Sequence, residues 1–160
     1  MRSASRAAAA AVALLVLTGA RAQTCADKTI VRRRARDVSA AANPAFVTLD
    51  AVVAYDELVS ATLTATARGD FGGAGANLTV STAGAALACD GGGKSQCTEA
   101  YACGAGVDVA GAVVDGVVAL TLEANAVVDF DYCPRGAYAE VETQVTFVVR
   151  TCATAAPTAA

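Results

Sequence analysis

The chain has 160 residues, a formal net charge of −3, six cysteines and neither His nor Trp. This length allows one domain and hardly a second. Without His there is no Ser-His-Asp or Cys-His nucleophile system and no His-ligated zinc or haem.

The first 22 residues are typical of an export signal. Arg2 and Arg6 form a basic start, and residues 7–17 are an apolar run shorter than the roughly 20 residues of a membrane span. Ala20-Arg21-Ala22 then offers an A-x-A cleavage site. We expect cleavage after this site and a secreted, extracellular product; a retained membrane anchor is the alternative. No later segment is long and apolar enough to predict a membrane span.

The remaining chain is acidic except for one basic block. Removal of residues 1–22 leaves 9 basic and 15 acidic residues, a formal charge of −6. An acidic, aromatic-poor body argues against nucleic acid as a partner. The basic block consists of Arg32, Arg33, Arg34 and Arg36. Three interpretations of this block are open. It is a solvated strand or arm, or it contacts an anionic polymer such as a sulfated or uronic polysaccharide. The third is that it is an R-x-x-R processing site.

All six cysteines lie beyond the predicted cleavage site, and their even number in an exported chain predicts three disulfides. Paired C-x2-C spacings, which zinc sites need, are absent. Terminal strands of a sandwich are commonly neighbours, and a Gly-rich run lets the chain turn back on itself. The expected pairs are Cys25–Cys152, Cys89–Cys97 and Cys103–Cys133.

Two segments alternate with the period of two that a half-buried antiparallel strand requires. In the first, the inward set is Val59, Ala61, Leu63, Ala65 and Ala67. In the last strand, the inward set is Ala139, Val141, Val145, Phe147 and Val149.

Shorter patterns complete the list of elements. Strands are expected at residues 46–55, 77–82 and 117–123, with weaker candidates at 29–33 and 127–132. One helical turn is expected within 109–114. Gly-rich breaks separate these patterns, which together favour an all-β fold: a disulfide-stapled antiparallel β-sandwich, jelly-roll-like, with seven or eight strands. We expect four regions, namely a signal peptide (1–22), a basic segment (23–44), the β-sandwich domain (45–152) and a disordered tail (153–160).

Val107-Asp108-Val109, the segment 115–122 and the turn at Gly69-Asp70-Phe71 resemble the late strands of galactose-binding-like jelly-roll modules. In those modules a short V-D-V strand and a turn precede a D-G-x-V-x-L strand. The resemblance covers residues 45–150 at the level of pattern. It implies a jelly-roll sandwich that binds a glycan.

Two short motifs concern the surface. Asn77-Leu78-Thr79 is an N-glycosylation acceptor, which implies an exposed position in a eukaryotic host. The run at residues 91–95, Gly-Gly-Gly-Lys-Ser, resembles part of a phosphate loop, but Ala88 stands where that motif needs its first Gly. We interpret it as a surface loop between two cysteines.

Carboxylate pairs are the remaining candidates for chemistry. Glu140 and Glu142 lie two residues apart on one strand face, within the separation a glycosidase pair needs, although that face is predicted to be solvated. Asp129 and Asp131 are candidate calcium ligands, because calcium takes oxygens from carboxylates and loop carbonyls. Calcium is thus the one cofactor considered, with Asp50, Asp70 and Asp90 as possible partners.

These observations predict a secreted, non-catalytic β-sandwich module that binds a glycan, a surface or a protein. A structural matrix or cell-surface protein without a small ligand is the first alternative. A small carbohydrate-active hydrolase is the second.

Overall fold

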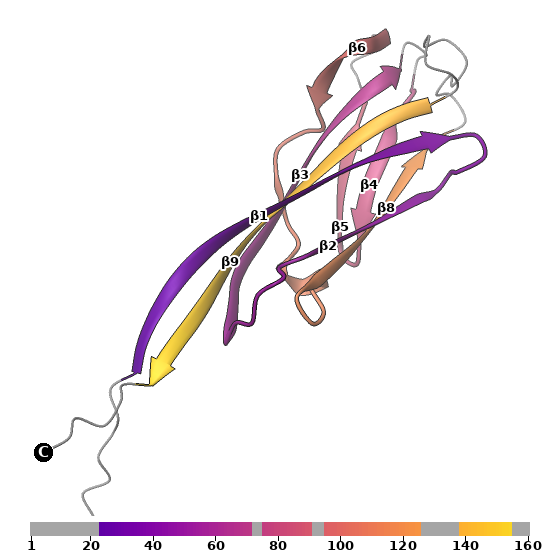
Figure 1. Ribbon diagram of the computed structural model, residues 1–160. Coiled ribbons are helices and arrows are strands. Elements are labelled where there is room, and N and C mark those ends of the chain that lie inside the picture. The colour runs from indigo at the N-terminus through magenta and orange to yellow at the C-terminus, as the bar shows by residue number, and fades with distance from the viewer. Residues whose placement is uncertain (1–22, 72–74, 91–94, 126–137, 155–160) are drawn as a thin grey trace, which may run out of the picture.

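The computed structural model describes residues 23–71, 75–90, 95–125 and 138–154, and it is built almost entirely from β-strands (Figure 1). The described strands are β1 (Gln23–Ser39), β2 (Ala45–Asp50), β3 (Glu57–Asp70), β4 (Leu78–Thr82), β5 (Ala85–Cys89), β6 (Ser95–Ala102), β7 (Val107–Asp108), β8 (Val117–Ala124) and β9 (Tyr138–Thr154). The expected helical turn is present as a 3₁₀ turn, η2 (Ala110–Ala112).

The strands form two antiparallel sheets packed face to face. One sheet has the order β1-β9-β3-β6, with β7 added on β3, and the other has the order β2-β8-β4-β5. Apart from the two-residue β7, eight strands are thus divided equally between two sheets, with successive strands β1, β2 and β3 changing sheet each time. This is a jelly-roll arrangement, so the predicted fold class is confirmed.

The core lies between the two sheets and consists of the residues that the alternating patterns indicated. Every inward residue predicted for the last strand is fully buried in β9. In β3, four of the five predicted residues are buried: Ala61, Leu63, Ala65 and Ala67. The exception is Val59, which is 41% exposed because the pairing of β3 with β9 shifts register between Leu58 and Ser60. Val59 is the extra residue at this bulge, and the inward–outward alternation of residues 61–67 does not continue through it.

β1 is much longer than the predicted segment 29–33. It pairs with β9 over its full 17 residues, from Gln23 opposite Thr154 to Ser39 opposite Tyr138. The outer part of this pair extends beyond the sandwich as a two-stranded ribbon (Figure 1), and residues 23–29 are all exposed. The basic block therefore belongs to a sheet strand, and only Ile30 and Val38 of β1 are buried.

The disulfides confirm one predicted pairing and correct two. Cys25 and Cys152 are bonded and lie directly opposite each other in the ribbon. Cys89 is bonded to Cys103, so the pairs Cys89–Cys97 and Cys103–Cys133 are wrong. β5 and β6 belong to different sheets, and Cys89 meets the residue that follows β6 instead of Cys97 within that strand. Cys97 also forms a disulfide, and Cys133 lies outside the described residues.

Other differences are local. β2 ends at Asp50, and residues 51–56 form the connection to β3 rather than a continuation of the strand. β5 and β6 were not predicted, and the candidate strand at 127–132 lies outside the described residues. Among the described residues, no helix has the length and apolar character to cross a membrane.

Candidate functional site

The two long sides of the sandwich differ. On one side, the Cys89–Cys103 disulfide joins the end of β5 to the residue after β6, and so links the two sheets covalently. On the other side, the edge strands β1 and β2 lie beside each other without pairing. We call this side the β1–β2 seam and define it by residues 32–36 of β1 and 48–50 of β2.

Three arginines of β1 project toward the seam. In an antiparallel pair, directly opposed residues project to the same face of the sheet. The β9 partners of Arg32, Arg34 and Arg36 are all fully buried on the inner face: Val145, Thr143 and Val141. Because β1 is the edge strand, the inner face at these positions opens onto the seam instead of the core.

A buried polar contact joins β9 to β1 at the seam. The Thr143 hydroxyl is completely buried and donates to the backbone carbonyl of Arg34 at 3.1 Å. A buried hydroxyl needs such a partner, and the contact satisfies it beside the seam-facing arginines.

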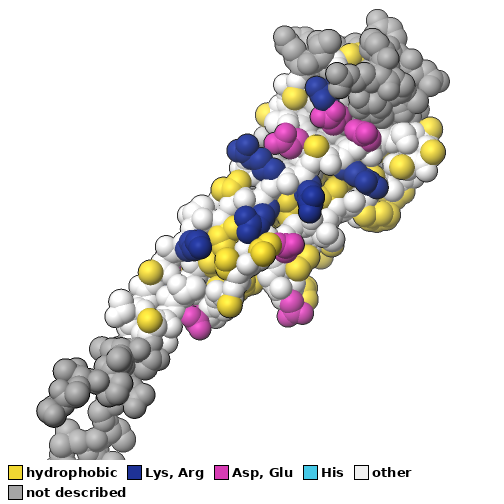
Figure 2. All heavy atoms as spheres, in the orientation of Figure 1, with side chains coloured by type: hydrophobic (Ala, Val, Ile, Leu, Met, Phe, Trp, Pro, Cys, Tyr) yellow, Lys and Arg dark blue, Asp and Glu magenta, His cyan; other side chains and the backbone are white. Residues whose placement is uncertain are grey.

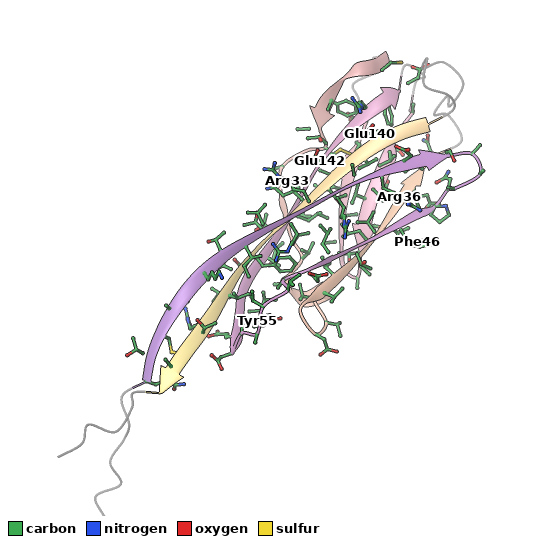
Figure 3. All side chains as sticks on the ribbon, viewed as in Figure 1. Arg33, Arg36, Phe46, Tyr55, Glu140 and Glu142 are labelled. Carbon is green, nitrogen blue, oxygen red and sulfur yellow. A yellow bond between two sulfur atoms is a disulfide. The ribbon has the colours of Figure 1, made fainter. Side chains whose placement is uncertain are left out.

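Arg33 points the other way. Its Nε donates to the Gln144 side-chain oxygen at 2.6 Å across the outer face of the sheet. Figure 3 shows Arg33 and Arg36 on opposite sides of the β1 ribbon, with Arg36 between β1 and β2. The block that looks continuous in the sequence is thus divided by the strand into an outer and a seam-facing set.

Arg32 closes one end of the seam. Its Nε donates to the carbonyl of Asp50 at 2.9 Å, and its NH2 group donates to the carbonyl of Ala51 at 3.1 Å. These bonds tie β1 to the start of the β2–β3 connection. The next residue, Val52, has a positive φ of 50° and a side chain that is 72% exposed. A β-branched residue rarely adopts this conformation, which costs about 1–3 kcal/mol.

Arg34 and Arg36 are exposed, and neither guanidinium has a hydrogen-bond or ion-pair partner among the described residues. Arginines elsewhere are paired: Arg68 binds Glu140, and Arg150 bridges Asp27 and Glu57. Lys and Arg side chains follow the line of β1 on the surface, with apolar atoms between them (Figure 2). Within the part of the chain that the structure describes, Arg34 and Arg36 thus present positive charge that no ion pair neutralises.

Three hollows lie beside β1 and the β2–β3 connection, and two of them are on the seam or at its end. One of about 300 Å³ is lined by Arg32, Arg33, Arg34, Thr48, Leu49, Asp50 and Val52. A second, of about 460 Å³, contains no residue of β2; it is lined by Ala35, Arg36, Asp37, Ser39, Ala42 and Glu140, and so lies near the end of β1 toward the outer face. A third, of about 640 Å³, lies at the end of the seam beside the β2–β3 connection and includes Tyr55 and Asp115. The first and third hollows share Asp50 and Val52 as lining residues, so they are adjacent.

The other predicted site residues lie away from the seam or outside the described chain. Asn77 is half-buried just before β4, and its backbone N–H and C=O are both bonded to Asn125. Asp129 and Asp131 lie outside the described residues. In residues 23–71, 75–90, 95–125 and 138–154, no group of three or more Cys, Asp or Glu side chains is placed to hold a metal ion.

The carboxylate pair on β9 does not form a catalytic arrangement. Glu140 and Glu142 project from the outer face of the sheet, as predicted, and Glu140 is bound by Arg68. Neither carboxylate lies in an enclosed, apolar site, since Glu140 is half-buried and Glu142 is exposed.

No protein-family model matches the sequence, and no curated protein matches it. A function is therefore inferred from the chemistry of the seam residues alone. Sequence patterns had indicated the arginines of the seam but not Val52, Tyr55 or Asp115. Of these, only Asp115 carried a recognisable signal, the Asp-Gly pair of a tight hairpin turn.

Proposed function

We propose that the chain is a secreted, non-catalytic β-sandwich module that binds an anionic polysaccharide along the β1–β2 seam. The observation that carries this proposal is the row of seam-facing arginines, in which Arg34 and Arg36 are exposed and have no acidic partner among the described residues. The rest of the exported chain is strongly acidic, so this row is a local feature and not part of a generally basic surface.

The chemistry of the arginines fits sulfate and carboxylate groups. A guanidinium is planar, always charged, and donates two parallel hydrogen bonds to such groups. Alternate residues of a strand are about 7 Å apart, so Arg32, Arg34 and Arg36 form a regular line roughly 13 Å long. An extended chain with repeated anionic groups can contact two or three of these side chains at once, which a single small anion cannot.

Two features support secretion. The N-terminal segment has the basic start, short apolar run and A-x-A site of an export signal. The disulfides Cys25–Cys152 and Cys89–Cys103 are of the kind that persists in oxidising compartments. Within this proposal, Asn77 is an N-glycan acceptor in a eukaryotic host, since it is partly exposed at the start of β4.

A pair of ligands that differ only in charge tests the proposal. Dextran sulfate and unmodified dextran have the same backbone, and the exported form of the protein, beginning at Gln23, is titrated with each by isothermal calorimetry. We expect binding of dextran sulfate, with polygalacturonate as a weaker carboxylate ligand, and no detectable binding of dextran. Affinity should fall between 0.1 and 1 M salt, because the screening length shortens from about 10 Å to about 3 Å.

The location of binding is measured at the same time. Amide resonances of residues 32–36 and 48–50 should shift when dextran sulfate is added to ¹⁵N-labelled protein. Absence of dextran sulfate binding at 0.1 M salt, or shifts confined to other parts of the described chain, would contradict the proposal.

A further inference from the structure

We propose that the hollow at the end of the seam is a subsite for an uncharged sugar ring, so that the ligand is a mixed chain with a neutral unit followed by anionic units. This inference rests on the proposed function, because it takes the arginine row as the binding site for the anionic units. The hollow has a volume of about 640 Å³ and lies where residues 50–55 approach the turn at Asp115-Gly116.

The walls of the hollow are held in place by backbone contacts. Val114 and Val117 exchange two backbone hydrogen bonds of 2.8 and 2.9 Å, and Asp115 and Gly116 between them both have positive φ. This is the two-residue hairpin turn that an Asp-Gly pair favours. The Ala51 N–H donates to the Gly116 carbonyl at 2.9 Å, which ties the β2–β3 connection to the turn.

Tyr55 forms one side of the hollow. A Cβ atom placed on Gly116 would lie 3.5 Å from both Cε1 and the hydroxyl oxygen of Tyr55, which is ordinary van der Waals contact. The ring therefore packs against the turn and is only partly exposed, while Figure 3 shows Tyr55 near the end of the sandwich where β2 leads to β3. A fixed aromatic ring beside a hollow offers an apolar surface for the C–H groups of a sugar.

The polar groups of the hollow select against anions. The carboxylates of Asp50 and Asp115 and the hydroxyl of Tyr55 have no hydrogen-bond or ion-pair partner among the described residues. Carboxylates accept hydrogen bonds from the hydroxyl groups of a sugar and repel sulfate or carboxylate groups. The chemistry of this hollow is thus opposite to that of the arginine row.

The two subsites are adjacent. Asp50 and Val52 border both this hollow and the hollow of about 300 Å³ at Arg32 and Arg34. Arg32 lies between the two and is bonded to backbone carbonyls. An extended ligand that places a neutral ring against Tyr55 therefore brings its next units to Arg34 and Arg36. This arrangement places the neutral unit at the Tyr55 end of the seam and the anionic units at Arg34 and Arg36.

Uncharged oligosaccharides test the subsite separately from the arginines. ¹⁵N-labelled protein beginning at Gln23 is titrated with isomaltotetraose, cellotetraose and galactotetraose, and amide shifts are recorded. We expect at least one of these sugars to shift residues 51–56 and 115–116 while residues 34–36 stay unchanged. Asp115→Asn removes the charge but keeps the turn, because Asn-Gly adopts the same conformation. It should weaken that binding at least tenfold, and Tyr55→Phe should weaken it less.

The outcomes distinguish this inference from the proposed function. If dextran sulfate binds at residues 32–36 but none of the three neutral sugars shifts residues 51–56 and 115–116, the subsite is wrong and the proposed function stands. Equal binding of a neutral sugar by Asp115→Asn and the unmodified protein also overturns the subsite. If dextran sulfate does not bind, the proposed function fails, and with it the ordered, mixed ligand.

Discussion

Removal of the Cys25–Cys152 disulfide should destabilise the protein although the bond buries almost nothing. The bond joins residues separated by 127 positions, whereas Cys89–Cys103 spans 14. In the chain-entropy model, a crosslink across a loop of this length stabilises the folded state by about 4.7 kcal/mol or slightly more. Cys25 is exposed and Cys152 is partly exposed, so replacing both by Ala leaves no cavity. The expected loss therefore comes almost entirely from the greater freedom of the unfolded chain.

Urea unfolding followed by circular dichroism measures this loss on the Cys25→Ala, Cys152→Ala protein. We expect the free energy of unfolding to fall by about 4–5 kcal/mol, equivalent to roughly 15 °C in melting temperature for a chain of this size. The dependence of that free energy on urea should become steeper, because an unfolded chain without the crosslink exposes more surface. A loss below about 1 kcal/mol with an unchanged urea dependence would refute the reasoning.

Three further predictions concern a glycine, a carboxylate and the mature N-terminus. Gly69→Ala should lower the unfolding free energy by about 1–3 kcal/mol in chemical denaturation, because the added Cβ would lie 3.0 Å from the Phe71 ring; an unchanged midpoint would contradict this. Arg150 lowers the pKa of Asp27 through a hydrogen bond, so the stabilisation of the ribbon by this pair is complete above the ordinary pKa of 3.8 and is lost as pH falls through the lowered value. An NMR titration in which Asp27 has an ordinary pKa would exclude the pairing. Intact mass of the exported protein should show Gln23 as the first residue, and a mass that includes Met1 would rule out signal cleavage.

The sequence predicts best those strands that have one face in the core and the other in solvent. β9 and most of β3 have one face in the core and one in solvent, so their side chains alternate in polarity. β1 lacks this alternation because arginines occupy positions 32, 34 and 36 on its inner face, and its length was underestimated for that reason. An edge strand tolerates inward charges because they reach solvent at the seam, and such charges also discourage pairing with a second sheet.

The seam itself requires information that no local pattern contains. Its residues come from β1 and β2, which are edge strands of different sheets, and only the strand order brings them together. The same limitation explains the wrong disulfides. The spacing in the sequence suggested that Cys89 and Cys97 are close to each other. In the fold, β5 and β6 belong to different sheets, and the end of β5 lies beside the residue after β6, so Cys89 is bonded to Cys103. Tyr55 reaches the hollow at the end of the seam through the β2–β3 connection, for which the alternating pattern predicted a continued strand.

Affinity for dextran sulfate in two charge-matched variants tests the central claim most directly. Arg34→Gln and Arg33→Gln remove the same charge from neighbouring residues of one strand. Both residues border the hollow of about 300 Å³, but Arg34 projects toward the seam, whereas the Arg33 guanidinium is bonded to Gln144 on the outer face. The seam predicts a loss of about tenfold for Arg34→Gln, corresponding to one charge-assisted hydrogen bond of about 1.5 kcal/mol, and a much smaller loss for Arg33→Gln. Equal losses in the two variants would show that net charge, and not the seam, is responsible for binding.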